Sequence, residues 1–401
     1  MGLVSPLGNT PEELWRRLIA GCSAVKPVTR FDSGRFACKL AAEVESCPLP
    51  EEAEPHRHEL KRLDPFVRYA LSASGSALAA SGFPLARLAE ASGGIYMGVS
   101  MGGLGTLENG FLRQEAEGPE RTDPYLISAT IPNTAAGMIA LTYGFDGPQY
   151  TLVGGCSSGV QAIGEAVEAI RSGRFDWALA GGAEAVITPI TFSGFQAMGI
   201  LSPATDPQAA PRPFDQARDG MVVGEGAGVL MLENRDAALA RGAPLLAEVT
   251  GYSTSSVTRH AFFSCSAATA RCMERALADA ELDPVGLDCI YAHAGGLAGD
   301  ANELQAVRQI WNGSGGPALT SIKGHIGYSF GAGGPLDVIA AILALAEQQI
   351  SPTLHFSSLP PELSGLDIVD QPRNQRLRTS LINSFGLGGV NACLLVSEAG
   401  A

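Results

Sequence analysis

The sequence predicts a layered α/β protein made of two comparable halves. Short apolar runs with the length of buried strands alternate along the 401 residues with segments whose apolar residues recur at helical spacing. The alternation starts afresh after Glu233, without a literal repeat of the first half. We therefore expect an internal structural duplication, with an N-terminal half at 1–240 and a C-terminal half at 241–401.

The first half opens with a clearly marked helix. Thr10 can cap its N-terminus, Pro11 suits the first helical position, and Glu13 completes a capping box. A longer helix is expected at about 63–80. The expected buried strands of this half are GIYMGVS (94–100), YTLVG (150–154) and WALAGGAEA (177–185).

The second half repeats the alternation of strands and helices. Its expected strands are LLAEVTGYS (245–253) and LDCIYAHAGG (287–296), followed by a final strand pair between Leu377 and Val396. Its expected helices are 265–280, 300–311 and the almost wholly apolar segment 335–350. A helix that is apolar on every side is expected to be buried.

Composition excludes several classes of protein. A net charge of −14 disfavours nucleic acid as a partner, although a local basic patch could still dock an acidic protein. The eight cysteines are scattered, which argues against a disulfide framework and against a zinc site. We find neither a signal peptide nor an apolar run of about 20 residues that could span a membrane, and expect a cytoplasmic protein.

One cysteine stands out by its surroundings. Cys156 lies among glycines and serines between an expected strand and a helix whose Val160, Ile163 and Val167 share one face. The positive end of a helix dipole lowers the pKa of a thiol from about 8.5, so this position predicts a thiolate nucleophile. A small residue buried at a tight turn would leave the same local pattern.

Four motifs together give the chain a recognisable resemblance. They are Cys156 with its helix, AGGAEA (180–185), RPFDQARDGMVVGEGAGVLMLE (212–233) and NSFGLGGVNA (383–392). In these motifs, and from GLVSPLGNT to NACLLV, the chain resembles the β-ketoacyl-acyl carrier protein synthases of the ketosynthase I and II type. The resemblance implies a thiolase fold, with two βαβαβαβ-type halves in a five-layered α-β-α-β-α core. Members of that family usually have a further strand before GLVSPLG.

The resemblance also implies a reaction and partners. The cysteine would accept an acyl chain from the phosphopantetheine arm of an acyl carrier protein, and malonyl-acyl carrier protein would then lose CO2 and attack the thioester. This decarboxylative Claisen condensation needs a nucleophile and hydrogen-bond donors to the developing oxyanions. No cofactor or metal of the protein's own is implied. The expected assembly is a dimer, either with itself or with a paralogue.

His293 matches the first of the family's two catalytic histidines. Glu303 matches the acidic residue that supports the donors, and Asp300 follows the family pattern as well. The family's His-Gly-Thr-x-Thr reads His-Ala-Gly-Gly-Leu here, so the threonine hydroxyls that line the pantetheine channel are absent.

The second histidine is replaced. In IKGHIGYSFGAGG, Lys323 matches the family's lysine, and the position five residues later holds Tyr328. A phenol can donate one hydrogen bond, so Tyr328 is expected to act as the second donor. His325 would need an insertion to align, although it could reach the pocket from the next turn.

Two further groups of residues follow from the resemblance. Phe385 matches the gating phenylalanine, and Gly386 and Leu387 continue the wall of the substrate pocket. Lys61 and Arg62 match a basic patch that docks the carrier protein, and Arg68 lies nearby, although clustered charges are more often simply solvated.

We therefore expect a condensing acyltransferase that uses Cys156, His293 and Tyr328, and the altered donor favours polyketide or other secondary metabolism over fatty acid synthesis. One alternative is a partner subunit that resembles a chain-length factor, suggested by GGPLDV (333–338) and the AHAGG loop. Chain-length factors generally lack the cysteine that this chain keeps. A specialist in acyl transfer or decarboxylation on the same fold is a third possibility.

Overall fold

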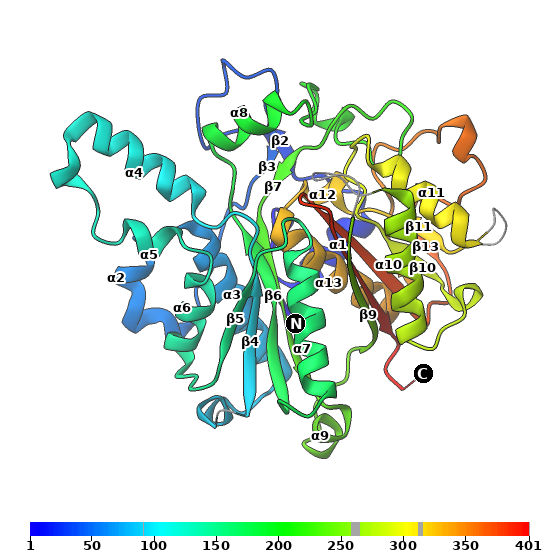
Figure 1. The fold of residues 1–401 in the computed structure, drawn as a ribbon, viewed down its shortest axis with the longest axis horizontal. Helices are drawn as coiled ribbons and strands as arrows, with labels where there is room; N and C mark the ends of the chain where they lie inside the picture. The colour runs from blue at the N-terminus through cyan, green and yellow to red at the C-terminus, as the bar shows by residue number, and fades with distance from the viewer. Residues whose placement is uncertain (91, 258–264, 312–315, 401) are drawn as a thin grey trace.

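Two five-stranded sheets lie face to face, with helices between them and on both outer sides (Figure 1). The computed structural model describes residues 1–90, 92–257, 265–311 and 316–400. The first sheet has the order β1 (Gly2–Val4), β8 (Gly226–Glu233), β6 (Trp177–Glu184), β4 (Gly93–Gly98) and β5 (Gln149–Leu152). The second has the order β9 (Glu248–Ser256), β15 (Val390–Ser397), β14 (Thr379–Gly386), β10 (Cys289–Tyr291) and β11 (Ala318–Thr320).

The two sheets share one pattern of strand directions. In the first, β4 pairs in parallel with β5 and β6, and β8 pairs antiparallel with β6 and β1. In the second, β10 pairs in parallel with β11 and β14, and β15 pairs antiparallel with β14 and β9. The predicted duplication is therefore a duplication of topology, and it needs no repeated sequence.

Helices complete five layers. The helices α3 (Pro65–Ser81) and α6 (Thr134–Tyr143) cover the outer face of the first sheet, and α10 (Ser266–Asp279) and α11 (Asp300–Trp311) lie beyond the second sheet. The middle layer holds α7 (Ser158–Arg171) and α13 (Gly333–Glu347), which contact strands of both sheets. The expected α-β-α-β-α core is confirmed.

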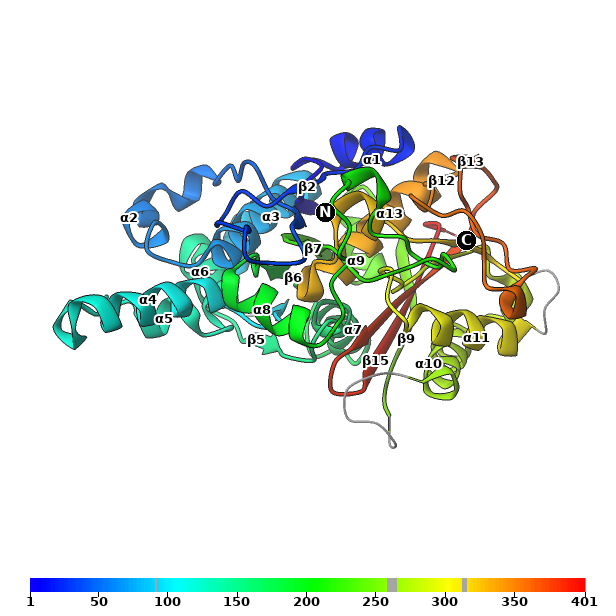
Figure 2. The ribbon, with the colours of Figure 1, turned by 90° about the horizontal axis from the view of Figure 1, so that it is seen from above.

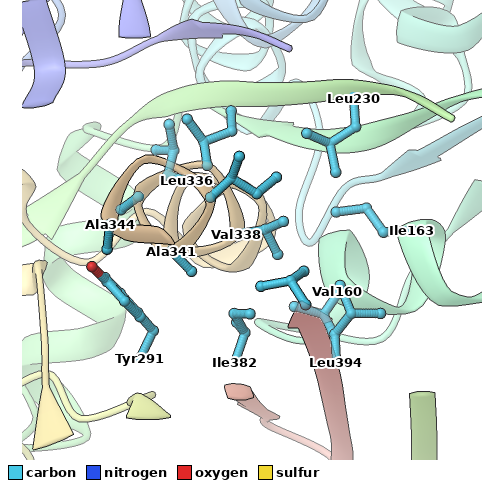
Figure 3. Packing of buried hydrophobic residues seen from close by; sticks show 14 of the residues in the cluster. Val160, Ile163, Leu230, Tyr291, Leu336, Val338, Ala341, Ala344, Ile382 and Leu394 are labelled. Carbon is cyan, nitrogen blue, oxygen red and sulfur yellow. The ribbon is translucent and has the colours of Figure 1, made fainter. Parts of the chain in front are cut away.

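The central helix α13 explains the apolar segment near residue 340. Its side chains meet Leu230 of β8 on one side, Val160 and Ile163 of α7 on another, and Ile382 of β14 on a third (Figure 3). Together with the turn before it, this segment is long and apolar enough to cross a membrane, but 83% of it is buried within the protein. Burial against both sheets accounts for its composition.

Most local expectations agree with the structure. Helix α1 (Pro11–Ile19) begins where predicted, and the Thr10 side chain accepts a hydrogen bond from the Glu13 backbone N–H. The segment YTLVG was expected to be a buried strand, and this prediction is wrong, because β5 is an edge strand with half-buried side chains. The strand expected at 287–296 ends at Tyr291, so His293 lies in the loop that follows it.

The remaining elements lie around this core (Figure 2). Small sheets are formed by β2 (Val25–Pro27), β3 (Leu40–Ala42) and β7 (Val223–Gly224), and by β12 (Gln349–Ile350) and β13 (Arg373–Asn374). The other helices are α2 (Arg57–Leu60), α4 (Leu104–Glu117), α5 (Leu126–Thr130), α8 (Pro189–Ala197), α9 (Arg235–Ala240) and α12 (Lys323–Ile326). Helix α4 projects from one side of the molecule (Figures 1 and 2).

The two halves approach each other closely at the start of α7. A Cβ atom added to Gly159 would lie 2.3 Å from the carbonyl oxygen of Gly331, and one added to Gly182 would lie 2.3 Å from the same oxygen. Both distances are far below van der Waals contact. Glycine at these positions therefore allows the N-terminal half to approach the loop that precedes α13.

We predict that Gly159→Ala destabilises the protein by about 1–3 kcal/mol, because the added methyl group overlaps backbone that cannot easily move. The control is Gly194→Ala in α8, where a Cβ meets nothing within 4 Å. This control should be neutral or stabilising by up to about 1 kcal/mol, because alanine favours the helix. Urea unfolding of both variants measures the difference, and equal stability would contradict the close approach.

Candidate active site

A cavity of about 730 Å³ opens between the two halves. The N-terminal half contributes Cys156 at the start of α7, and the C-terminal half contributes His293, Tyr328 and Phe385. Each comes from the end of a regular element or from the loop next to it, where the backbone can turn a side chain into the opening. The structure thus brings Cys156 together with residues that lie more than a hundred positions later in the sequence.

Cys156 is fixed from both halves. It lies two residues before α7, and the Ser384 hydroxyl of β14 donates to its backbone carbonyl at 3.0 Å. Although its sequence neighbours are glycines and serines, the residue is only 6% exposed. Its sulfur faces the Tyr328 hydroxyl and the backbone N–H of Leu387, and both lower the thiol pKa.

The prediction that Cys156 is a thiolate is wrong for the protein before an acyl chain is attached. Burial raises the pKa of the Cys156 thiol above its ordinary value, and this effect outweighs the neighbouring donors. The negative charge of Glu184 acts in the same direction. Cys156 is therefore a thiol at neutral pH, and the donors around it stabilise negative charge when it develops.

His293 is a neutral imidazole whose tautomer is set by the backbone. The Phe385 N–H donates to Nδ1 at 3.2 Å, so the single ring proton lies on Nε2. Nε2 lies 2.7 Å from the Tyr328 hydroxyl oxygen. Burial, together with the charge of Lys323, lowers the pKa of His293 to about 3, which keeps the ring neutral at physiological pH.

Tyr328 occupies the position opposite His293, as predicted for the second donor. Its N–H donates to the Val222 carbonyl at 2.8 Å, and its carbonyl accepts from the Gly224 N–H at 2.9 Å. These bonds tie the loop of the C-terminal half to the N-terminal half. Burial and the adjacent Cys156 raise the pKa of the phenol, so the hydroxyl keeps its proton.

Lys323 forms a buried ion pair behind the cysteine. Its Nζ donates to Asp337 Oδ2 at 2.5 Å and to the Ala292 carbonyl at 2.7 Å. Both charged side chains are almost fully buried, and both line a small second cavity of about 10 Å³ that also touches Cys156 and His293. The pair holds the backbone just before His293.

Glu303 contacts the backbone of the catalytic loop and not its imidazole ring. It accepts from the N–H groups of His293 and Ala294, each at 3.0 Å, and from the Asn383 side chain at 2.8 Å. Asp300 holds the same loop through three successive N–H groups, those of residues 295, 296 and 297. Burial raises the pKa of Glu303 to about 7. Both carboxyl groups therefore position the loop.

The gating role predicted for Phe385 stays a prediction. Phe385 lies within β14, paired with Asn391, and its ring packs against His293 at 5.3 Å between centroids. The turn after it contains Gly388 and Gly389, which have φ angles of +93° and +77°. Leu387 lies in this turn, next to the sulfur of Cys156.

Other expected residues lie away from the cavity. Lys61 and Arg62 are exposed beyond α2, at the side of the molecule from which α4 projects, with Arg62 over the ring of Tyr125 at 5.1 Å (Figure 1). Arg68 is half-buried in α3. The suggestion that His325 could reach the pocket is wrong, because both of its ring nitrogens face backbone carbonyls at 2.8 Å.

Sequence reasoning missed two buried acids. Asp337 pairs with Lys323, and the signal was a carboxylate inside the apolar stretch of α13. Glu184, inside the AGGAEA motif, accepts hydrogen bonds from four backbone N–H groups, those of residues 100, 101, 102 and 331. It thereby joins the loop before α13 to the first sheet.

Comparison with known proteins agrees with this arrangement. The family model described as "Beta-ketoacyl synthase, N-terminal domain" matches residues 1–238, and "Beta-ketoacyl synthase, C-terminal domain" matches residues 246–357. The chain belongs to the β-ketoacyl synthase family. Like its relatives it is a condensing enzyme of the acyltransferase type.

The relatives span the whole chain. A protein named 3-oxoacyl-[acyl-carrier-protein] synthase 2 from Synechocystis is 34% identical, over 98% of this chain and 95% of its own length. One of the same name from Staphylococcus aureus is 31% identical, over 98% of each chain. The solved structure titled "The ishigamide ketosynthase/chain length factor" has a TM-score of 0.91 and 30% identity, covering 100% of this chain and 98% of that one.

A second solved structure includes a carrier protein. Its title describes a type II polyketide synthase acyl-carrier protein in complex with its ketosynthase, bound to the hexaketide. The matching chain has a TM-score of 0.89 and 27% identity, with coverage of 99% and 98%. These β-ketoacyl synthase relatives thus include proteins named 3-oxoacyl-[acyl-carrier-protein] synthase and a ketosynthase whose title names a type II polyketide synthase.

Burial changes which cysteine should react first. We predict that iodoacetamide labels the exposed Cys22 before Cys156 in the folded protein. Among the buried thiols Cys156 should react first, because it alone of these lines the described 730 Å³ cavity. Its labelling rate should still be rising with pH above about 8.5, the ordinary thiol value, because burial raises its pKa. Peptide mapping after timed labelling at several pH values measures the order of labelling and its dependence on pH. Faster labelling of Cys289 or Cys393 than of Cys156 would contradict the assignment of Cys156 to the cavity.

Proposed function

We propose that this protein joins an acyl chain held on Cys156 to malonyl-acyl carrier protein by decarboxylative Claisen condensation. The observation that carries the proposal is the convergence of three groups at one cavity: a buried thiol, a neutral imidazole with its proton on Nε2, and a protonated phenol. These supply the nucleophile and two donors to a developing oxyanion. The phosphopantetheine of the carrier protein brings both substrates, and the proposal needs no cofactor of the protein's own.

The first half-reaction requires no strong base. The thiol of Cys156 attacks the acyl thioester carbonyl, and the electron pair of the carbonyl moves onto oxygen. We assign the backbone N–H groups of Cys156 and Leu387, both of which lower the pKa of the Cys156 thiol, as the donors to this oxyanion. When the intermediate collapses, the pantetheine sulfur leaves and takes up the proton that the cysteine has lost, so one thiol is exchanged for another.

The second half-reaction uses the imidazole and the phenol. The C–C bond to the malonyl carboxylate breaks, CO2 departs, and the electron pair becomes an enolate whose oxygen accepts from His293 Nε2–H and the Tyr328 O–H. The enolate carbon then attacks the acyl-cysteine carbonyl, the tetrahedral intermediate collapses with cleavage of the C–S bond, and the sulfur of Cys156 takes up a proton from water to become the thiol again. Glu303 and the Lys323–Asp337 pair hold the loop that carries the imidazole.

The walls of the pocket have separate roles in this proposal. Phe385, Gly386 and Leu387 close the cavity above the sulfur. Because Phe385 is held in β14, we assign any gating motion to the turn that carries Leu387. Lys61, Arg62 and Arg68 remain the proposed docking patch for the acidic carrier protein, which would place the enzyme in the cytoplasm.

We further assign the protein to type II polyketide or related secondary metabolism. Tyr328 in place of the family's usual histidine supports this assignment, as do the solved relatives whose titles name type II systems. The alternative is a partner subunit similar to a chain-length factor. The similarity of this chain to the solved ketosynthase/chain length factor supports that alternative. The thiol of Cys156, which this chain keeps at the cavity, supports condensing activity instead.

We predict that Cys156→Ala abolishes condensation and acylation. Tyr328→Phe should lower condensation about 10²-fold while acylation of Cys156 continues, because only the donor to the enolate is lost. Product formation with acyl- and malonyl-carrier protein is measured by mass spectrometry. Tyr143→Phe in α6, outside the cavity, is the matched control and should be silent. If Cys156→Ala leaves product formation by a reconstituted pair unchanged, the chain is a partner subunit.

Exposed apolar side chains on α4, α5 and α6 and just after β5 support a dimer, with itself or with a ketosynthase paralogue. They are Phe111, Leu112, Ile127, Leu141 and Val153, each more than half exposed.

We predict that Ile127→Glu weakens the dimer, because a charge would be buried in the interface. Val285→Glu, at an exposed position 83% accessible in the other half, is the control. Light scattering after size exclusion measures the mass of the assembly. If the parent protein is a monomer both alone and after co-expression with a paralogue, the proposed dimer is contradicted.

A further inference from the structure

A buried polar cluster lies behind the catalytic loop, between the second sheet and the helices that cover it. Asn383 of β14 and Cys393 of β15 are paired directly across the two strands, and both side chains are fully buried. The side-chain amide of Asn383 contacts Met273 of α10 and Glu303 of α11. Of these four residues, the proposed mechanism has so far used only Glu303.

The direction of the Asn383 amide is set by its partners. Glu303 accepts from Nδ2 at 2.8 Å, and the Met273 sulfur lies 3.4 Å from the same nitrogen. A carboxylate and a thioether only accept hydrogen bonds, so the nitrogen must face them. The amide oxygen therefore faces Cys393, whose S–H donates to Oδ1 at 3.2 Å. If the amide turned over, its oxygen would meet the carboxylate of Glu303.

The thiol of Cys393 is available as the donor in this bond. Burial raises its pKa well above the ordinary value, with a further contribution from the neighbouring Cys272, so the group keeps its proton at neutral pH. Cys272 donates its own proton to the Ser253 carbonyl at 3.5 Å. Because a sulfur accepts hydrogen bonds weakly, the proton of Cys393 is directed to the Asn383 oxygen rather than to the sulfur of Cys272.

Asn383 fixes the same carboxyl group that holds the backbone of His293. Oε1 of Glu303 accepts from the Asn383 amide and from the His293 N–H, and Oε2 accepts from the Ala294 N–H. The Phe385 N–H, two residues along β14, donates to the ring of His293 at 3.2 Å. One strand thus holds both parts of His293, the ring directly and the backbone through Glu303. If Glu303 shifts, the backbone of His293 moves away from the N–H that orients its ring.

We propose that Cys393 is a positioning residue for the condensation: its thiol fixes the direction of the Asn383 amide, and this amide holds Glu303 against the catalytic loop. The inference rests on the proposed function, because it concerns the donor that His293 supplies to the enolate. It predicts that a hydroxyl can replace the thiol and that a methyl group cannot. A thiol that only filled space would tolerate alanine at least as well as serine, because serine brings a polar group into a buried site.

Two variants separate these roles. We expect Cys393→Ala to lower kcat for condensation about tenfold, because a misplaced oxyanion donor costs rate in the chemical step. Acylation of Cys156 and the KM for malonyl-carrier protein should stay within about twofold of the parent, because neither depends on the imidazole. Cys393→Ser should keep kcat within about threefold of the parent, since its hydroxyl donates to the same amide oxygen. Mass spectrometry measures both the product and the acylated protein.

Cys272→Ala is the matched control, since the bond of this equally buried thiol goes to Ser253. It should leave kcat within about twofold of the parent. Asn383→Leu removes the amide and should lower kcat at least as far as Cys393→Ala. Thermal unfolding checks that each variant is folded, and the two Cys393 variants decide the matter if Asn383→Leu is not. A Cys393→Ala variant as fast as the parent, a Cys393→Ser variant as slow as Cys393→Ala, or an equal loss in Cys272→Ala overturns the inference.

The pH dependence of kcat gives a readout that packing alone does not move. Burial raises the pKa of Glu303 to about 7, and the bond from Asn383 is the largest of the influences that lower it. The backbone N–H of His293 and the charge of Lys323 in α12 lower this pKa as well, whereas the charge of Asp300, on the same helix as Glu303, raises it.

Only the carboxylate form of Glu303 accepts from all of its donors, so kcat should fall as the pH drops through this pKa. Cys393, which approaches Glu303 from β15, is a neutral thiol over this range. In Cys393→Ala the Asn383 amide is no longer held toward Glu303, so the pKa of Glu303 rises. The acidic limb of kcat should then move to higher pH by about half a unit or more. Cys393→Ser should keep the limb of the parent, and an unmoved limb in Cys393→Ala contradicts the role of the amide.

Hydrogen exchange tests the same contacts without any substrate. The backbone N–H groups of His293 and Ala294 donate to Glu303, so in Cys393→Ala both should exchange at least about threefold faster than in the parent and in Cys393→Ser. Mass spectrometry of fragmented peptides measures both sites. If the parent does not condense and exchange follows this order, the proposed function is refuted and the positioning role stands. If the parent condenses and exchange is equal in the two Cys393 variants, the positioning role alone is refuted.

Discussion

The site depends on how closely α7 packs against the loop before α13. Gly159 and Gly182 leave room for the carbonyl of Gly331, and the carboxylate of Glu184 accepts from the Gly331 N–H at 3.2 Å. Through this contact the loop of the C-terminal half reaches the first turn of the helix that follows Cys156. A side chain at either glycine would separate the halves, and the cysteine would no longer face its donors.

Protein atoms cover most of the surface of the groups at this junction, which changes the chemistry of each group. His293 is neutral because burial disfavours its charged form, and the same effect keeps Cys156 protonated. Buried charge is accepted only where it is paired, as in Lys323 with Asp337, or where backbone N–H groups surround it, as with Glu303. In such surroundings a single donor has more effect on an oxyanion than it would in water.

Much of the fold and part of the site could be predicted from the sequence. Thr10 and Pro11 mark the start of α1 through local bonds, and the apolar segment of α13 indicates a buried helix wherever it packs. Cys156, His293 and Tyr328 were found by their motifs, and the structure brings them together. Asp337 was missed, because an acid in an apolar helix does not show which cation it pairs with. His325 was misjudged, because the carbonyl groups that its ring nitrogens face belong to Cys22 and Pro352, which are distant in the sequence.

By itself the sequence determined the layered α/β class, the order of its elements and the residues able to do the chemistry, since all of these follow from local periodicity and residue type. Only the tertiary structure decided that Cys156 rests as a thiol, that the proton of His293 lies on Nε2, and that Glu303 holds backbone and not the ring. Those properties depend on burial and on partners distant in the chain. A protonation state is set by the surrounding charges, donors and loss of water, and these exist only once both halves have packed together.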